Sequence, residues 1–398
     1  MTTVTWLIAG GVNTDSVCRD TAICFVFILA MFIITRRTSY LIEIMIDYIY
    51  ECCINHVFVC LIDVFTDGLG FLPSVQDPTL QILVDKVPTV LSSARAPSTN
   101  QAYGLAYKRW RVWALTYPEI QPLPANHLHV LLYLMQLEES ISSYSTINLA
   151  ICAIKWAHGM AGLESPTDHV LVQEALQGFR RRLARPTIRK EPFMKDHIHR
   201  LITEVQREYV VDMRNTVLIV IAYFAMLRVS ELRYIQACNI IVFEDRLEIV
   251  IPQSKCDQLR EGDKVLVAKL GGALCPVELF CAYLAMVQID VFSQTYSDQY
   301  IFRRFLTRAS GVQLTPDNIP MTYSRIREIV KGKAKQIGLD VSKIGTHSMR
   351  AGGATIAANS GIDDRVLQRH GRWSTATSKN RYVLDDIQSQ LSVSKILG

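Results

Sequence analysis

Residues 346–382 read THSMRAGGATIAANSGIDDRVLQRHGRWSTATSKNRY, and this stretch decides how the rest of the chain is interpreted. His347 and Arg350 are three residues apart, so on a helix they lie on one face and can point at one small anion. Trp373 follows a Gly-Arg step, and Tyr382 comes nine residues after it. A tyrosine brought to a bound anion from a later segment can act as a nucleophile on phosphorus.

The segment before this stretch contains an arginine in an apolar setting. Residues 196–226 are predicted to form two helices, and the second is apolar almost all round, so it should be buried. Arg228 lies at its end, where a charge is costly unless it is paired or belongs to a site. Glu231, three residues later, can pair with it, and taken alone this pairing explains the arginine.

Short alternating runs predict a small antiparallel sheet, at residues 240–243, 247–251 and 265–267. Lys255 lies where a polar hairpin leaves the second run, with Lys264 and Lys269 nearby. Helices are predicted again at residues 277–288 and 323–337 and over the segment that carries His347 and Arg350. The glycines after Arg350 allow another backbone to approach closely.

Six residues of this chain occur in the same order as the catalytic residues of a known protein family. Their predicted helix, hairpin and helix contexts also match that family. They are Arg228, Lys255, His347, Arg350, Trp373 and Tyr382. The chain therefore resembles the tyrosine recombinases, the phage integrase family, over about residues 95–390. One position departs from the usual pattern, since many members have histidine where Trp373 stands. Tryptophan, a known variant there, can donate one indole N–H but cannot shuttle protons.

The resemblance implies a site-specific recombinase or integrase that cuts and rejoins double-stranded DNA through a 3′-phosphotyrosyl link, with no metal, ATP or other cofactor. Tyr382 would attack the phosphorus, and Lys255 would protonate the departing 5′-oxygen. His347 would act as the base, and Arg228, Arg350 and Trp373 would hold the phosphate oxygens. Glu231 is expected to orient Arg228 or the histidine. The family pattern also implies a homo-tetramer on DNA, with the tail at residues 385–398 docking on a neighbouring subunit.

The expected fold class is mainly α with a small antiparallel β-sheet (α+β). Residues 95–186 resemble the helical, SAM-like core-binding domain that precedes the catalytic domain in this family. The catalytic domain itself is expected at residues 193–390. Its four helices are predicted from Ser98 or Thr99 to Leu115, from the prolines at 122 and 124 to Leu137, over 144–159, and over 167–183. An aromatic stripe on the first helix is interpreted as core.

Basic residues of this region are predicted to contact DNA. One group lies beside the aromatic stripe, where a solvated face is the alternative interpretation. The stronger group crowds the end of the fourth helix and the following linker, where Glu191 is the single acid nearby. The predicted DNA-binding residues are Lys108, Arg109, Arg111, Arg180, Arg181, Arg182, Arg185, Arg189 and Lys190.

Composition and charge agree with a globular protein that binds a polyanion. Of the 398 residues 49% are apolar, and the net charge is +5. Residues 1–90 hold 4 Lys/Arg against 9 Asp/Glu, which leaves 38 against 28 in residues 91–398. The ten cysteines have no zinc-ligand spacing, so reduced thiols in an intracellular protein are expected. The resemblance adds that this protein has access to DNA. That compartment is the nucleus in a eukaryote, or the cytoplasm and nucleoid in a bacterium.

Residues 1–90 form an apolar extension outside the resemblance, with no assigned role. The run at residues 21–35 is short for a membrane span, and membrane association is not favoured although the sequence leaves it open. From Leu41 to Phe65 an amphipathic helix fits better than a second span. Residues 74–98, with prolines, serines and little periodicity, are interpreted as a boundary.

Three alternatives compete with a recombinase. A type IB topoisomerase uses the same tyrosine chemistry as a monomer, but usually has lysine in the place of His347. A non-catalytic DNA-binding remnant of a mobile element is a second, although none of the six positions is visibly altered. A membrane-anchored protein is a third. The GRWS motif at residues 371–374 favours a recombinase of a eukaryotic mobile element over a bacterial chromosome-dimer resolvase.

Overall fold

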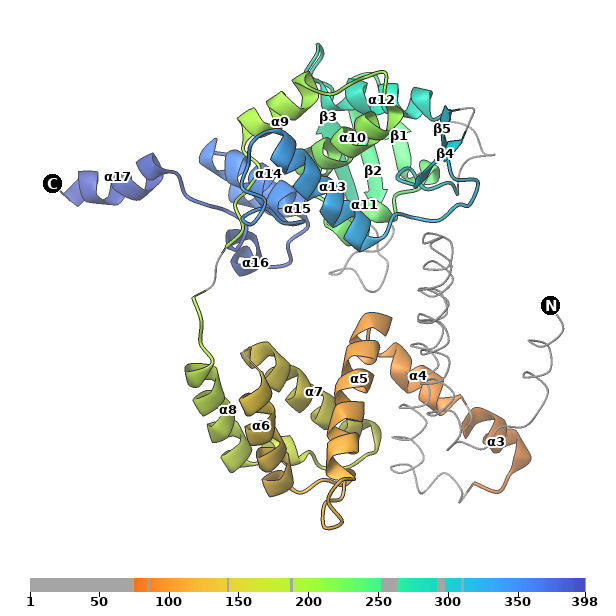
Figure 1. The fold of residues 1–398 in the computed structure, drawn as a ribbon, viewed down its shortest axis with the longest axis vertical. Coiled ribbons are helices and arrows are strands. Elements are labelled where there is room, and N and C mark those ends of the chain that lie inside the picture. The colour runs from red at the N-terminus through yellow and green to blue at the C-terminus, as the bar shows by residue number, and fades with distance from the viewer. Residues whose placement is uncertain are drawn as a thin grey trace, which may run out of the picture. The chain divides into compact units, whose positions relative to one another are not determined.

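The computed structural model describes residues 75–84, 86–141, 143–186, 189–251, 263–291, 298–308 and 311–397 (Figure 1). The chain divides into two compact units, Met1–Pro186 and Thr187–Gly398, and each is described by itself. The predicted apolar run at 21–35, the predicted helix at 41–65 and Lys255 all lie outside the described residues. Among the helices of the described ranges, none combines the length and apolar character needed to cross a bilayer.

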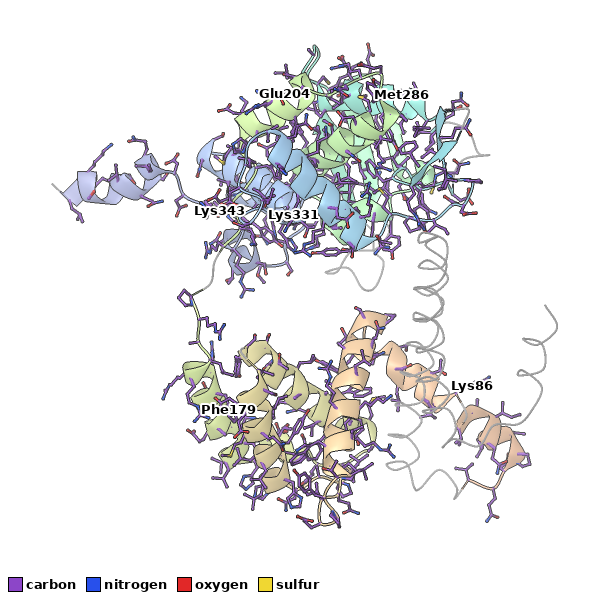
Figure 2. All side chains as sticks on the ribbon, in the orientation of Figure 1. Lys86, Phe179, Glu204, Met286, Lys331 and Lys343 are labelled. Carbon is purple, nitrogen blue, oxygen red and sulfur yellow. The ribbon has the colours of Figure 1, made fainter. Side chains whose placement is uncertain are left out.

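The first unit is a helical bundle. Its main helices are α5 (Pro97–Ala114), α6 (His127–Ser140), α7 (Tyr144–Met160) and α8 (Val170–Arg182). The aromatic stripe of α5 belongs to the core as predicted, because Tyr107 and Trp110 are buried. The Trp110 indole donates to the Pro122 carbonyl and packs edge-on against Tyr133 of α6. Phe179 of α8, labelled in Figure 2, is buried in the same core.

Three helices of the first unit begin at other residues than the sequence predicted, and a proline or a capping side chain determines the start of each. Helix α5 begins at Pro97, since proline is suited to the first helical position, and not at a Ser98 or Thr99 cap. Helix α6 begins at His127, where the Asn126 side chain accepts from the Leu128 N–H. Before α8, Pro166–Asp168 forms a separate 3₁₀ turn.

The proline-rich segment before α5 is partly helical. Helices α3 (Pro78–Val84) and α4 (Val87–Ser93) fall within the residues interpreted as a boundary. Neither helix buries a side chain, which explains why its sequence has little apolar periodicity.

The second unit combines helices with a three-stranded antiparallel sheet, and the prediction of a mainly α fold with a small antiparallel sheet is confirmed. The sheet has the order β1 (Ile240–Val242), β2 (Arg246–Ile251) and β3 (Asp263–Ala268). Leu247 of β2 faces Val242 on one side and Val267 on the other. A separate hairpin of β4 (Phe305–Arg308) and β5 (Gly311–Leu314) was not predicted, because its exposed residues lack apolar alternation.

Most helices of this unit come before or after the sheet along the chain, and α17 extends away from the rest of the unit (Figure 1). In chain order they are α9 (Lys195–Thr203), α10 (Val210–Phe224), α11 (Val229–Arg233), the 3₁₀ turn Ala237–Asn239, α12 (Pro276–Met286), α13 (Tyr323–Gln336), α14 (Ser348–Asn359), α15 (Asp364–Gly371), α16 (Ala376–Asn380) and α17 (Ile387–Leu397).

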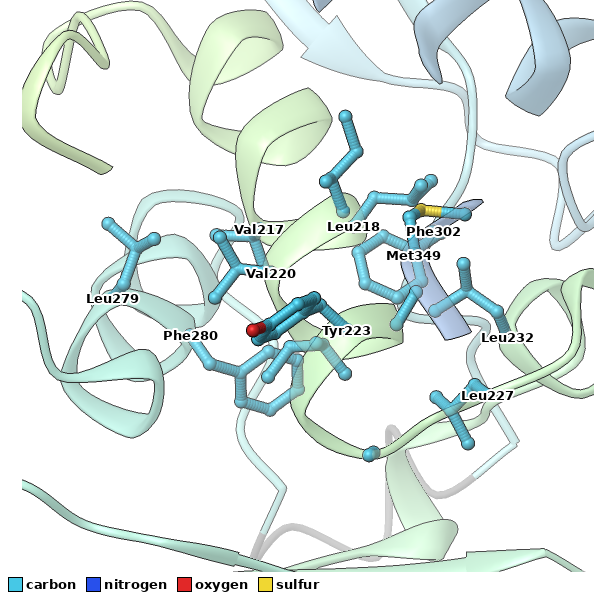
Figure 3. Close-up of a cluster of buried hydrophobic side chains, with 14 of the residues drawn as sticks. Val217, Leu218, Val220, Tyr223, Leu227, Leu232, Leu279, Phe280, Phe302 and Met349 are labelled. Carbon is cyan, nitrogen blue, oxygen red and sulfur yellow. The ribbon is translucent and has the colours of Figure 1, made fainter. Parts of the chain in front are cut away.

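Helix α10 is the centre of the core. It is buried almost all round, as its sequence predicts, and contacts α9, α12, α13 and α14. Figure 3 shows Tyr223 of α10 close to Phe280 of α12, while Met349 of α14 lies beside Phe302. Burial raises the pKa of the Tyr223 phenol to about 12, so the ring stays neutral in this core. The start of α14 is thus anchored on the most buried helix of the unit.

Two glycines allow α14 to approach α10 closely. A Cβ atom on Gly352 would lie 1.9 Å from the Phe193 carbonyl oxygen and 2.9 Å from the Tyr223 ring. A Cβ atom on Gly353 would lie 2.5 Å from the Tyr223 carbonyl oxygen. The backbone of α14 therefore touches its neighbours directly at Gly352 and Gly353. These contacts fix the position of the helix close to Arg350.

The segment before α9 pairs with the loop that precedes α14. Glu191 N–H donates to the Lys343 carbonyl at 2.8 Å, and Phe193 N–H donates to the Ser348 carbonyl at 3.0 Å. The Lys343 ammonium also forms an ion pair with the Glu191 carboxylate. These contacts hold the residues on both sides of His347.

Gly352→Ala should lower the free energy of unfolding by about 1–3 kcal/mol, because the added methyl group meets a backbone carbonyl that has no room to move. Gly332→Ala in α13 is the matched control, since nothing lies within 4 Å of its Cβ position. That change should stabilise the protein by about 0.5–1 kcal/mol through helix propensity. Urea unfolding followed by circular dichroism measures both, and equal stability of the two variants would contradict the packing argument.

Candidate active site

The start of α14 presents two of the predicted residues. The prediction placed His347 on this helix, but His347 is the N-cap residue, one position before the helix begins. Arg350 lies in the first turn and is fully buried. Its guanidinium donates to the carbonyl of Met226 at 2.5 Å and to the carbonyl of Gly371. A charge with no exposed surface is thereby held in place by backbone carbonyls from two other segments.

Arg228 lies four residues beyond the end of α10 and not at its last turn as predicted. The helix ends at Phe224, Met226 adopts a left-handed conformation with φ of 46°, and Arg228 becomes the N-cap of α11. The Arg228 N–H donates to Glu231 Oε2 at 2.8 Å, and its guanidinium Nη1 donates to Oε1 at 2.7 Å. The predicted pairing with Glu231 is confirmed, and this carboxylate orients the arginine from both backbone and side chain.

Glu231 also pairs with an arginine that sequence analysis did not single out. Arg372 Nη2 donates to Glu231 Oε2 at 2.9 Å, and both side chains are only 2% exposed. Burial raises the pKa of the Glu231 carboxyl, but attraction to Arg372 and the bonds from Arg228 outweigh it, so the pKa lies below its ordinary value. Glu231 is therefore an anion that two guanidinium groups share.

Trp373 and Tyr382 complete the cluster. The Trp373 ring centroid lies 4.5 Å from the Arg350 guanidinium carbon, and the Tyr382 ring lies 5.2 Å from it. The two rings are 5.6 Å apart. Tyr382 Oη lies 3.5 Å from His347 Nδ1, a long hydrogen bond of the kind that tightens when substrate binds.

Two side chains of α14, Thr355 and Asn359, fasten the tyrosine segment to that helix. Thr355 Oγ1 donates to the Tyr382 carbonyl at 3.2 Å and accepts from the Leu384 N–H at 3.2 Å. Because the Tyr382 carbonyl and the Leu384 amide are both bound to α14, the segment that carries the ring is held beside the helix that carries Arg350.

Positive charge and free donors accumulate in this cluster. Within the described residues Arg350 has carbonyl partners but no carboxylate partner. Burial, followed by repulsion from Arg228 and Arg372, lowers the pKa of Arg350 to about 9, so the group is charged at neutral pH. The buried Arg350 Nε and Trp373 Nε1 atoms have no hydrogen-bond partner among the residues that the structure describes. An anion with several acceptor oxygens would satisfy both the charge and the donors.

Two further residues of the cluster, Arg372 and His370, were not predicted from the sequence. His370 Nε2 lies 2.8 Å from the Phe224 carbonyl, and burial lowers the pKa of the imidazole, so it is neutral at physiological pH. Both residues contact the end of α10, nearly 150 residues earlier in the chain. The one available signal was their density, with Arg369, His370 and Arg372 next to Trp373.

The predicted DNA-contact residues are distributed over both units. In the first, Arg109, Arg180, Arg181 and Arg185 are exposed, whereas Lys108 and Arg111 are half-buried. Arg182 is exposed but forms a bidentate ion pair with Glu138. In the second, Arg189 is exposed, and the Lys190 ammonium donates to the Ser342 carbonyl. Arg182 and Lys190 therefore have protein partners that a phosphate would have to replace.

The structure thus brings together Arg228, His347, Arg350, Trp373 and Tyr382, while Lys255 lies outside the described residues. In the ranges that are described, no three His, Cys, Asp or Glu side chains gather closely enough to hold a metal ion.

Comparison with known proteins identifies the second unit. The sequence model of a protein family, described as the phage integrase family, matches residues 192–388. These residues belong to that family. An integrase/recombinase xerD homolog from Selenomonas ruminantium is 25% identical over 297 residues, which cover 74% of this chain and 83% of that protein. The predicted family is confirmed, and the chain is a tyrosine recombinase, a DNA strand transferase.

A solved structure shares the fold. The XerH site-specific recombinase, bound to palindromic difH substrate in a post-cleavage complex, aligns with a TM-score of 0.52 at 13% identity. The alignment covers 75% of this chain and 78% of the XerH chain.

Glu231→Gln should cost about 3–5 kcal/mol of folding stability at neutral pH, because it leaves the buried Arg372 charge uncompensated. The folded carboxyl has a lowered pKa, so its stabilising effect is complete above the unfolded value of about 4.3 and is lost as the pH falls through the folded value. Urea unfolding between neutral and acidic pH should show the cost of the substitution shrinking below about pH 4.

Glu328→Gln is the control, since Glu328 pairs with Arg325 on the surface and both side chains are more than half exposed. It should change stability by less than about 1 kcal/mol at any pH. A cost of Glu231→Gln that persists unchanged at acidic pH would contradict the shared ion pair.

Proposed function

We propose that this chain is a site-specific recombinase or integrase that cuts double-stranded DNA by forming a 3′-phosphotyrosyl link at Tyr382. The observation that carries the proposal is that a buried guanidinium and an indole with a buried N–H pack against the Tyr382 ring. Arg350 is buried without a carboxylate partner in the described residues, and its Nε and the Trp373 Nε1 are unsatisfied. A phosphodiester supplies one negative charge and two non-bridging oxygens, which match these donors.

The reaction begins when the Tyr382 oxygen attacks the phosphorus. An Oη–P bond forms, the P–O5′ bond breaks, and the phenolic proton passes to His347 Nδ1, at 3.5 Å. Arg228 and Arg350 hold the non-bridging oxygens, where negative charge grows in the transition state, and Trp373 adds an N–H donor. Lys255 supplies the proton that the departing 5′-oxygen needs. These cations take the role that metal ions play in other phosphoryl-transfer enzymes, so the proposal calls for no cofactor.

Rejoining is the reverse of the first step. The phosphotyrosyl bond replaces one phosphodiester by another, so little free energy is lost and no ATP is needed. A 5′-hydroxyl from another strand attacks the phosphorus, its proton leaves to the residue that served as acid, and Tyr382 departs with a proton from His347.

We assign DNA binding to the helical region at residues 95–186, as a core-binding domain, together with the catalytic domain at residues 193–390. Arg180, Arg181 and Arg185 follow one another at the exposed end of the first unit, where phosphates can reach them. The compartment in which the protein acts is then the one that contains its DNA, the nucleus in a eukaryote.

The last helix is assigned to assembly of a homo-tetramer on DNA. Ile387, Ile396 and Leu397 of α17 are 71%, 84% and 82% exposed, and Leu391 is 44% exposed. Apolar side chains at these positions gain from burial against another protein surface. We propose that residues 385–398 dock on a neighbouring subunit.

Tyr382→Phe should abolish covalent attachment to DNA, because phenylalanine has no oxygen to bond to phosphorus. The substrate is a nicked suicide duplex built from repeats that flank the gene, and attachment is read as a band that survives SDS. Tyr209→Phe is the matched control, since Tyr209 is 59% exposed before α10, and it should keep full attachment. Attachment by the Tyr382→Phe variant would overturn the assignment of the nucleophile.

Removing residues 387–398 should abolish assembly of several copies on DNA and leave binding of single copies intact. Gel filtration with a duplex separates the two effects. Leu391→Ser should weaken assembly in the same way, whereas Gln388→Ser on the same helix should leave it unchanged. Full assembly of the shortened chain would refute the docking role of α17.

A further inference from the structure

Arg372 occupies a backbone position that is unfavourable for an arginine. It follows α15 with φ of 55° and ψ of 47°, the left-handed conformation in which helices commonly end. Glycine is usual there, because a Cβ atom comes too close to the following carbonyl oxygen in this conformation. The Arg372 guanidinium is also almost completely buried, which adds a desolvation cost. Both costs need an offsetting interaction.

The Arg372 guanidinium joins three segments of the catalytic unit. Nη1 donates to the His370 carbonyl at 2.9 Å and to the Ala225 carbonyl at 3.3 Å. Nη2 donates to the Met226 carbonyl at 3.0 Å and to Glu231 Oε2 at 2.9 Å. The end of α15, the turn after α10 and helix α11 are therefore fixed to one planar group.

Two of these acceptors are shared with the arginines assigned to the phosphate. Glu231 gives one carboxylate oxygen to the Arg228 guanidinium and the other to Arg372. The Met226 carbonyl accepts from both Arg350 and Arg372. The Arg372 side chain is 2% exposed, whereas the Arg228 side chain is 12% exposed, so of the two partners of Glu231 it is Arg228 that reaches the surface.

We propose that Arg372 is a positioning residue for strand cleavage, which fixes Arg228 through Glu231 and Arg350 through the Met226 carbonyl. It also sets the direction of Trp373, because the left-handed turn at Arg372 places the indole directly against Gly371, where a Cβ atom would lie 1.8 Å from the ring. This inference rests on the proposed function of the site, since it assigns Arg372 a part in that reaction.

The charge of Arg372 contributes as well as its hydrogen bonds. Burial lowers the pKa of Arg372, and attraction to Glu231 and, more weakly, to Asp263 opposes that effect, while Arg228 repels it. Arg372 in turn repels Arg350. A phosphate bound by Arg228 and Arg350 relieves this repulsion, so Arg372 increases the affinity of the site for an anion without touching it.

The decisive variant is Arg372→Gly, because glycine suits the left-handed backbone and removes the guanidinium without adding strain. Single-turnover cleavage of the suicide duplex at saturating protein should fall about 100-fold, the effect of displacing catalytic groups by about 1 Å. The dissociation constant for the duplex should change less than threefold by comparison, since most DNA contacts lie elsewhere; this threefold limit is about 0.65 kcal/mol. Arg369→Ala, an exposed arginine of α15, is the matched control and should cleave at the wild-type rate.

Rescue separates positioning from simple stabilisation of the fold. Millimolar methylguanidinium should restore part of the cleavage rate of Arg372→Gly, because it can enter the vacated space and bind Glu231. Arg372→Lys should recover the ion pair with Glu231 but not the four-way contact, and should cleave at an intermediate rate. Thermal unfolding of each variant shows whether the folded fraction accounts for any loss.

A measurement without DNA keeps the inference testable if the duplex is not the natural substrate. Inorganic vanadate mimics a phosphate, and its binding to the wild-type protein can be followed by vanadium NMR. Arg372→Gly should weaken vanadate binding about tenfold, which corresponds to about 1.4 kcal/mol, and Arg369→Ala should not. Absence of DNA attachment with intact vanadate discrimination would count against the proposed function alone. Equal vanadate binding by wild type and Arg372→Gly would overturn the role of Arg372.

Discussion

The catalytic unit depends on one carboxylate that two guanidinium groups share. Glu231 accepts from Arg228 and Arg372, and all three groups are largely withdrawn from solvent. Without this anion the guanidinium groups of Arg228, Arg350 and Arg372 would repel one another at close range in a medium that screens charge poorly. Glu231 offsets only part of the positive charge, so the cluster is stable in the folded protein and keeps the excess of positive charge that the proposed reaction needs to hold a phosphate. Stability and reactivity therefore have the same electrostatic origin.

Close backbone packing determines where those charges lie. Gly352 and Gly353 allow α14 to touch the carbonyls of Phe193 and Tyr223, and the left-handed turn at Met226 directs a carbonyl to Arg350. The contacts with Tyr223 and Met226 involve the end of α10, the most buried helix, and the contact with Phe193 involves the segment before α9. Because a close-packed core has little room to adjust, small changes at these positions should be transmitted to the guanidinium groups.

Local patterns in the sequence were sufficient for much of this arrangement. Apolar periodicity predicted α10 and the sheet, and the order of Arg228, His347, Arg350, Trp373 and Tyr382 predicted a set of residues that the fold brings together. The sequence could not reveal Arg372, since its partners Ala225, Met226 and Glu231 are more than 140 residues away and two of them are backbone carbonyls. The end of α10 differed from the prediction for a related reason, because the carbonyl of the turn at Met226 is bound by Arg350 and Arg372 from far along the chain. The start of α6 depends instead on a local cap, in which Asn126 accepts from the Leu128 N–H.

Thr355 has a consequence for how the work is divided among copies of the protein. Its hydroxyl binds the tyrosine segment to the same helix that carries Arg350, so the Tyr382 phenol and the Arg350 guanidinium come from one polypeptide. Under the function proposed above, no copy takes its tyrosine from another. Each protomer would then cut one strand with its own residues, and the number of strands opened by an assembly would equal the number of its members with an intact site.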